Sequence, residues 1–167
     1  MAGFFMIEIS KIKCLLSYNA ETGLLTWNQA PSPKVKIGDV AGTITKQGYI
    51  RITILNNRLM AHRLAFAIYH GRWPDNQIDH INGLKHDNRI SNLRECTPEQ
   101  NMHNRSAYRI NKTGFKGVYQ PKNGKRFVAQ IRNGGKAHYL GAFDSAKEAS
   151  AAYAEAANAL HGEFARQ

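Results

Sequence analysis

Apolar residues at positions 1–70 alternate between the spacing of helices and the spacing of strands. The segment Ile7–Leu16 has apolar residues at helical intervals, whereas Leu24–Trp27 and Gly48–Leu55 have the period of two that is typical of half-buried strands. The pair Asn56-Asn57 tolerates positive φ and predicts a tight turn after the second strand. Helical spacing returns at Ala61–His70. The pattern therefore predicts short strands between two helices.

Residues 71–105 contain few apolar positions and many polar side chains of catalytic types. Gln77–Ile81 predicts a short strand, residues 82–91 a loop rich in Gly, Asn and Asp, and Asn92–Cys96 a returning strand. The dipeptide Thr97-Pro98 offers an N-cap and a first helical residue, so a helix is expected directly after the second strand. This layout brings polar residues that are distant in sequence to one place.

Residues 113–165 predict a three-stranded antiparallel sheet followed by one helix. The three predicted strands, joined by turns that contain glycine, are Gly117–Gln120, Arg126–Arg132 and Ala137–Phe143. The helix is expected to begin at the capping box Ser145–Glu148 and to end at Gly162. The helical stripe expected to pack on the sheet is Ala149, Ala152, Ala156 and Leu160.

Composition and charge indicate a globular protein with a polyanionic partner. The 167 residues are 43% hydrophobic and 21% charged, and the formal net charge is +11 at pH 7. Cys14 and Cys96 are too few for a four-cysteine zinc site, so we expect two free, buried thiols and no structural zinc. Glu8, Lys11 and Lys13 interrupt the apolar start, which is unlike a signal peptide and favours a reducing, intracellular compartment.

The polar residues of the segment 77–101 include the groups that hydrolysis of a phosphodiester requires, a base for water and a centre of positive charge. His80 can serve as the base, and Asn92 can hold its imidazole in place. Asp79 and Asn101 supply a carboxylate and an amide oxygen, which suit one hard divalent ion such as Mg²⁺ or Mn²⁺. Secondary candidates for contacts with metal or DNA are His62, Arg94, His103 and Asn104.

The stretch from His62 to Asn104 resembles the HNH homing endonucleases of phages and introns. The resemblance rests on Asp79-His80, Asn92 and Asn101, together with the sequence around them. It implies that domain 1–105 adopts the ββα-metal fold, with His80 as general base, Asp79 and Asn101 as metal ligands and Asn92 positioning the base. It also implies a cytoplasmic protein of a bacterial or phage-infected host cell. The CxxC pairs that brace some relatives with zinc are missing, so packing must hold the fold.

The C-terminal stretch 113–167, which follows a predicted linker at 106–112, resembles the DNA-binding domain of the Apetala-two/ethylene-response-factor family. The motifs that carry the resemblance are Gly117-Val118-Tyr119, Ala129–Arg132 and Tyr139–Phe143. The contacts to double-stranded DNA predicted from the basic face and the family pattern are Lys116, Tyr119, Arg126, Gln130, Arg132, Lys136, Tyr139 and Tyr153. Tyr119 and Asn123 stand where plant members carry arginine and tryptophan, so base preference does not transfer.

Together these features predict an α+β protein in which a ββα-metal nuclease domain precedes a sheet-plus-helix DNA-binding domain. The expected activity is DNA cleavage by a homing-type or phage nuclease with one divalent metal. The alternatives are a sequence-specific DNA-binding regulator without catalysis and an RNA-binding protein. The retained Asp79, His80 and Asn101 favour the enzyme, and a predicted sheet without paired surface aromatics argues against RNA. Target sequence, nicking or double-strand cleavage, and monomer or homodimer stay open.

Overall fold

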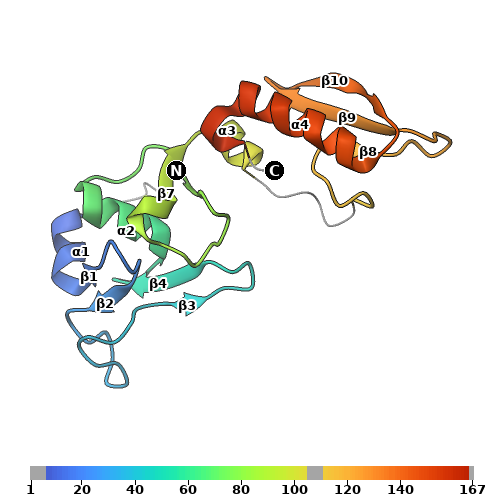
Figure 1. Ribbon diagram of the computed structural model, residues 1–167. Coiled ribbons are helices and arrows are strands. Elements are labelled where there is room, and N and C mark those ends of the chain that lie inside the picture. The colour runs from blue at the N-terminus through green and yellow to red at the C-terminus, as the bar shows by residue number, and fades with distance from the viewer. Residues whose placement is uncertain (1–6, 105–110, 166–167) are drawn as a thin grey trace. The chain divides into compact units, whose positions relative to one another are not determined.

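The computed structural model of the chain describes residues 7–104 and 111–165 (Figure 1). Its contacts divide into two compact units, Met1–Thr97 and Pro98–Gln167. Both units mix helices with antiparallel sheets, in agreement with the predicted α+β class. No helix in the described ranges has the length and apolar character needed to cross a membrane.

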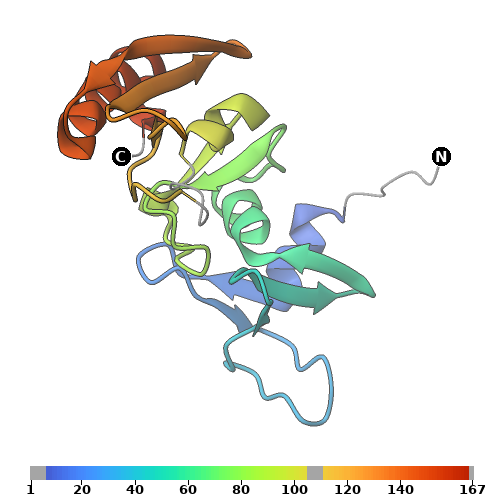
Figure 2. The same ribbon diagram turned by 90° about the vertical axis from the view of Figure 1, so that its right-hand side faces the viewer.

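The first unit surrounds one hydrophobic core. Its helices and strands are α1 (Ile9–Leu15), β1 (Leu16–Tyr18), β2 (Leu25–Trp27), β3 (Thr43–Ile44), β4 (Ile50–Ile54), β5 (Asn57–Met60), α2 (Ala61–His70), β6 (Gln77–His80), the short 3₁₀ helix η1 (Ile90–Asn92) and β7 (Leu93–Cys96). Three antiparallel sheets form, β1–β2, β3–β4–β5 and β6–β7. Helix α2 packs against α1, β4 and β5 (Figure 2). The core of this unit includes the fully buried residues Ile12, Leu16, Ile52 and Leu64.

Most predicted elements of this unit are confirmed within two residues of their ends, and α2 has the predicted bounds. The tight turn lies one position earlier than expected. Ile54 pairs with Asn57, so the turn residues are Leu55 and Asn56, with φ of 47° and 60°. Both residues adopt the left-handed backbone conformation because the turn must follow the twist of the flanking strands. Both cysteines are free as predicted, but Cys14 is exposed and only Cys96 is buried.

The second unit consists of a short helix and a sheet covered by a long helix. Its elements are α3 (Pro98–His103), β8 (Val118–Tyr119), β9 (Phe127–Asn133), β10 (Lys136–Phe143), α4 (Ala146–His161) and the 3₁₀ helix η2 (Gly162–Phe164). The strand order is β10–β9–β8, all antiparallel, and α4 covers one face (Figure 1). Ser145 and Glu148 form the predicted capping box, and Gly162 ends the helix.

The buried stripe of α4 differs from the predicted one. Its buried residues are Ala149, Tyr153, Ala157 and His161, whereas Leu160 is 45% exposed. The helix is rotated so that Tyr153 enters the core, where its ring lies against Gly117. A Cβ added at Gly117 would lie 2.1 Å from that ring, so only glycine fits at this point of the sheet.

The compact units also differ from the predicted domains 1–105 and 113–167. Helix α3 is grouped with the second unit, whereas the prediction put it in the first domain. Within the predicted linker 106–112, residues 106–110 lie outside the described ranges.

Candidate active site and nucleic-acid interface

Asp79 and His80 end strand β6, and both side chains are buried, with 6% and 4% of their surface exposed. The register of β6 and β7 sets Asp79 opposite Arg94. The Nε and Nη2 atoms of Arg94 donate to Asp79 Oδ2 at 3.0 and 2.9 Å. The paired strands therefore fix the orientation of the carboxylate through a charged hydrogen-bonded partner. Arg94 was predicted only as a secondary site residue.

Asn88 holds the imidazole of His80. Its Oδ1 lies 3.1 Å from His80 Nε2, and Asn88 is only 1% exposed. Because a carbonyl oxygen only accepts, a neutral His80 donates from Nε2 and keeps its basic lone pair on Nδ1. Burial lowers the pKa of His80, and the hydrogen bond that the ring donates to Asn88 and the charge of Asp79 oppose that shift only in part. The imidazole is therefore neutral at neutral pH, the form that a general base requires.

Asn92 closes the loop between β6 and β7 and does not hold the imidazole. Its Oδ1 accepts from the backbone N–H of Asn82 at 2.9 Å, and its Nδ2 donates to the carbonyl of Asp87 at 2.7 Å. The predicted direct contact between Asn92 and His80 is therefore wrong, because both ends of the amide are used by the loop backbone. Asn88 was missing from the predicted site. The sequence carried no periodic signal for it, since contacts of a loop depend on how the loop closes.

The N-terminal segment braces this loop from outside. Tyr18 Oη donates to the carbonyl of Asn88 at 2.7 Å, and the N–H of Ile90 donates to the carbonyl of Ala20 at 3.1 Å. Gly23 lies against the same backbone, so that a Cβ there would be 2.4 Å from Arg89 N. Burial raises the pKa of Tyr18 to about 12, which keeps its hydroxyl a donor. Packing by the N-terminal segment thus supports the loop between β6 and β7 without the CxxC pairs of a zinc site.

His62, on α2, packs against the ring of His80. The two rings meet edge to face with centroids 5.1 Å apart, and the ring of Tyr49 lies 5.4 Å from His62. Burial lowers the pKa of His62 to about 3, so the ring is neutral. Its Nδ1 has no hydrogen-bond partner within the described residues. Of the two roles left open by the sequence, phosphate binding or packing against the catalytic strands, the structure shows packing.

The donor atoms fit a hard divalent ion better than zinc. Asp79 offers a carboxylate and Asn101 an amide oxygen, and such oxygen ligands suit Mg²⁺ or Mn²⁺ when water and phosphate complete the coordination. Residues 7–104 and 111–165 contain no cluster of three His, Cys, Asp or Glu that could hold a metal. Asn101 is half-buried on α3, in the second unit. His103 and Asn104 lie in the same unit, where Asn104 is buried and His103 stacks on His161.

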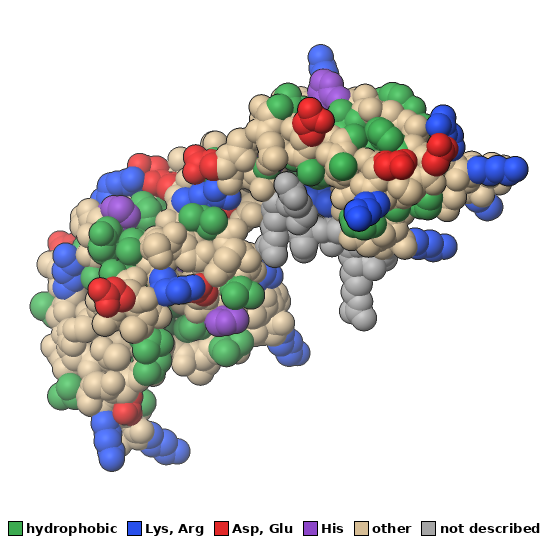
Figure 3. All heavy atoms as spheres, viewed as in Figure 1, with side chains coloured by type: hydrophobic (Ala, Val, Ile, Leu, Met, Phe, Trp, Pro, Cys, Tyr) green, Lys and Arg blue, Asp and Glu red, His purple; other side chains and the backbone are tan. Residues whose placement is uncertain are grey.

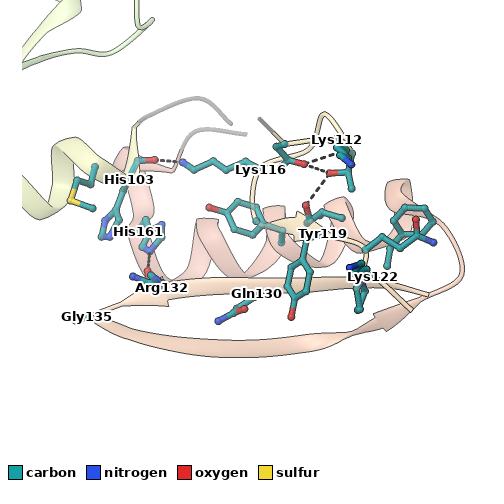
Figure 4. A pocket seen from close by; sticks show the side chains of 18 of the residues that line it. His103, Lys112, Lys116, Tyr119, Lys122, Gln130, Arg132, Gly135 and His161 are labelled. Atoms are coloured by element: carbon teal, nitrogen blue, oxygen red, sulfur yellow. Dashed lines mark hydrogen bonds between the residues drawn. The ribbon is translucent and has the colours of Figure 1, made fainter. Parts of the chain in front are cut away.

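Four of the predicted DNA contacts share the face of the sheet opposite α4. Tyr139 pairs with Gln130, Ala137 with Arg132 and Tyr119 with Val128, and paired residues point to the same side. Gln130 and Arg132 alternate along β9 with the buried Ala129 and Ile131, so their side chains point away from the core. Figure 4 shows Tyr119 and Gln130 projecting near each other. We name this face, defined by Tyr119, Gln130, Arg132 and Tyr139, the open sheet face.

Arg126, by the alternation of β9, belongs to the same side as the open sheet face. Its Nε donates to Asp144 Oδ1 at 2.8 Å, and both side chains are mostly exposed. Such an exposed ion pair contributes little to stability and is easily exchanged for a phosphate contact. Lys and Arg side chains also project from the surface of each unit in Figure 3.

Three predicted DNA contacts lie elsewhere. Lys136 pairs with Asn133, which puts its side chain on the face of α4. The ammonium of Lys116 donates to the carbonyl oxygen of His103. Tyr153 is 6% exposed and packs in the core, so its predicted DNA contact is wrong.

The open sheet face carries two exposed aromatic side chains. Tyr119 and Tyr139 are 47% and 68% exposed, on the two outer strands of the sheet. Tyr119 pairs with Val128 and Tyr139 with Gln130, so the two rings are not cross-strand partners. Aromatic rings on a sheet can stack on unpaired bases, which is the contact that an RNA-binding role would use.

Comparisons with known proteins agree with both parts of this description. Residues 59–103 match the family model of the HNH endonuclease, and residues 113–163 match that of the AP2 domain. An uncharacterized HNH endonuclease of Acanthamoeba polyphaga mimivirus is 32% identical over 110 residues, which cover 65% of this chain and 56% of the viral protein. No solved structure matches. Both resemblances seen in the sequence are confirmed, and the chain carries an HNH endonuclease region at residues 59–103 followed by an AP2 domain at residues 113–163.

Proposed function

We propose that the chain is a DNA endonuclease that hydrolyses phosphodiester bonds with one divalent metal ion and His80 as general base. The observation that carries the proposal is the buried Asp79-His80 pair at the end of β6, with the imidazole held by Asn88. Elements β6, β7 and α3 follow one another in the order expected of a ββα-metal finger. The AP2 domain directs the enzyme to double-stranded DNA.

In the proposed reaction His80 removes the proton from the attacking water. The lone pair on Nδ1 receives that proton, while the Nε2–H remains bound to Asn88 and keeps the ring from rotating. Asp79 and Asn101 would hold the metal, which when bound offsets negative charge on the phosphate and the leaving oxygen. Arg94 holds Asp79 in one orientation, and His62 excludes water from one side of the imidazole.

A DNA-binding regulator without catalysis is the second candidate. The Arg94–Asp79 ion pair favours it, because the guanidinium neutralises the carboxylate that the metal needs. The two candidates differ in one respect, since only the enzyme breaks a covalent bond in DNA. A homing-type or phage origin and a site of action in the cytoplasm of a bacterial or phage-infected cell belong to the proposal as well.

Metal removal tests the proposed chemistry. Supercoiled plasmid and pooled genomic fragments are expected to be nicked or cut with Mg²⁺ or Mn²⁺, and the product is expected to disappear in EDTA and to return when the metal is restored. Agarose gels measure the conversion of supercoiled DNA to open and linear forms. One active site per chain should give the open form first, and a linear form at the earliest times would indicate a dimer. Binding without cleavage of any of these substrates would support the regulator.

The open sheet face predicts which basic residue carries DNA binding. Arg132→Ala is expected to weaken binding about tenfold, since a side chain that contacts bases contributes about 1–3 kcal/mol. Lys136→Ala removes the same charge from the other face and is expected to change the affinity less than about threefold. Fluorescence anisotropy with a labelled duplex measures both, and the wild-type affinity should fall about 10³-fold between 50 and 200 mM salt.

Two results would contradict this assignment. Equal losses in Arg132→Ala and Lys136→Ala would mean that charge alone, and not the open sheet face, drives binding. Stronger competition by single-stranded RNA than by duplex DNA would mean that Tyr119 and Tyr139 stack on bases of RNA.

A further inference from the structure

Helix α3 contacts the AP2 domain through Glu99 and His103. Glu99 Oε1 accepts a hydrogen bond from the backbone N–H of Gly134 at 2.9 Å. The ring of His103 stacks on that of His161, with centroids 3.5 Å apart and planes 7° apart. The ammonium of Lys116 donates to the carbonyl oxygen of His103 (Figure 4). The helix is therefore held near both of its ends.

The partners of α3 belong to the β9–β10 turn and to the end of α4. Gly134 opens the two-residue turn between β9 and β10, and both turn glycines have positive φ. His161 ends α4, is 8% exposed and has its Nε2 3.0 Å from the carbonyl oxygen of Arg132. The stack on His103 is thus built on a ring that is itself fixed between α4 and β9.

The same partners belong to the open sheet face. Arg132 binds His161 through its carbonyl, while its side chain lies on the face proposed to contact DNA. The Gly134 turn joins the strands that carry Arg132 and Tyr139. A ligand that immobilises these strands therefore immobilises the atoms that hold α3.

We propose that the AP2 domain positions the metal-binding helix of the nuclease, with Glu99 and His161 as positioning residues for Asn101. Asn101 lies on α3 between the two points of attachment, two residues from Glu99 and two from His103. DNA binding on the open sheet face and orientation of Asn101 are then coupled through the Gly134 turn and the Arg132 carbonyl. This inference rests on the proposed function, in which Asn101 is a metal ligand.

Hydrogen exchange of the full-length chain in EDTA tests the attachment without any need for cleavage. Glu99→Ala is expected to speed exchange of the α3 amides about tenfold, the effect of losing one hydrogen bond to an oxygen acceptor. Glu99 is exposed, so the fold should tolerate the change. Glu99→Gln keeps an oxygen acceptor for Gly134 and should exchange like the wild type, as should Glu155→Ala, which removes an exposed carboxylate elsewhere in the same unit.

A random-sequence DNA duplex at low salt tests the coupling in the same assay. In the wild type the duplex is expected to slow exchange of α3, and in Glu99→Ala this protection should be smaller. His161→Phe gives an independent check, because it keeps a ring for the stack and removes the hydrogen bond to Arg132. The protection of α3 by the duplex in His161→Phe should lie between that of the wild type and that of Glu99→Ala.

Cleavage kinetics on supercoiled plasmid with Mg²⁺ or Mn²⁺ then separate positioning from binding. Glu99→Ala is expected to lower kcat about tenfold and to leave KM within about twofold, whereas Glu99→Gln and Glu155→Ala keep both constants. The inference would be overturned if α3 exchanged at the same rate in Glu99→Ala as in the wild type, or if the duplex did not slow exchange in the wild type. If the wild type still cleaved DNA in that case, the proposed nuclease function would stand. If the wild type did not cleave DNA but α3 exchanged faster in Glu99→Ala, the proposed nuclease function would be rejected and the attachment of α3 to the AP2 domain would stand.

Discussion

His80→Ala is expected to lower the rate of DNA cleavage by about 10²- to 10⁴-fold, the range that a general base contributes. His62, whose ring meets His80 edge on, is not expected to replace it, because burial lowers the pKa of His62 to about 3. DNA binding should be unchanged, because the open sheet face lies in the other unit. Single-turnover cleavage and fluorescence anisotropy on the same plasmid-derived duplex measure the two effects.

His80→Gln is the matched variant for this test. It keeps a polar side chain at the buried position of His80, which is only 4% exposed, and a side-chain amide can still donate to Asn88. It cannot accept a proton from water at neutral pH, so it should be as inactive as His80→Ala with better retention of stability. Cleavage by either variant within about threefold of the wild type would show that another group, or the metal alone, activates the water.

Gly23→Ala is expected to destabilise the first unit by about 2–6 kcal/mol, from strain at positive φ and from overpacking. Gly23 has a φ of +74°, and an added Cβ would lie 2.4 Å from Arg89 N and 2.6 Å from the carbonyl carbon of Asn88. The clash is with backbone, so the loop that holds Asn88 must move. Cleavage should fall with stability, because Asn88 holds the ring of His80.

Gly38→Ala separates the two causes of that loss. Gly38 has a similar φ of +89°, but no atom lies within 4 Å of its added Cβ. It should cost only the strain of the backbone, about 1–3 kcal/mol, and leave cleavage close to that of the wild type. Both tryptophans, Trp27 and Trp73, lie in the first unit, so urea unfolding followed by tryptophan fluorescence reports on this unit alone. Equal losses in the two variants would mean that Gly23 does not pack on the loop.

Local patterns in the sequence predicted most of the elements because each has a periodic or capping signal. The helix at Ala61–His70 and the capping box at Ser145 are such cases, and both are confirmed. The Asp79-His80 pair was placed at a strand end for the same reason, since β-strand alternation and the following loop are visible in the sequence. The assignments of catalytic and metal-binding roles remain predictions.

The partners within the site were harder to predict than its elements. Asn88 and Asn92 are alike in chemistry and lie four positions apart, and only the closure of the loop decides which amide reaches His80. Tyr153 was expected on the DNA surface because the family pattern put a contact there, whereas the observed phase of α4 buries its ring against Gly117. In both cases the deciding contact joins segments that are distant in the chain, and no local signal records such a contact.

The bracing of the Asn88 loop by the N-terminal segment has a consequence for modularity. The region that matches the HNH family begins at residue 59, whereas Tyr18, Ala20 and Gly23 support the loop from well before it. A graft of residues 59–103 onto another DNA-binding protein would transplant the catalytic residues and leave their scaffold behind. The transferred segment must begin at or before Tyr18, because the residues that support the loop lie upstream of the region that matches the family.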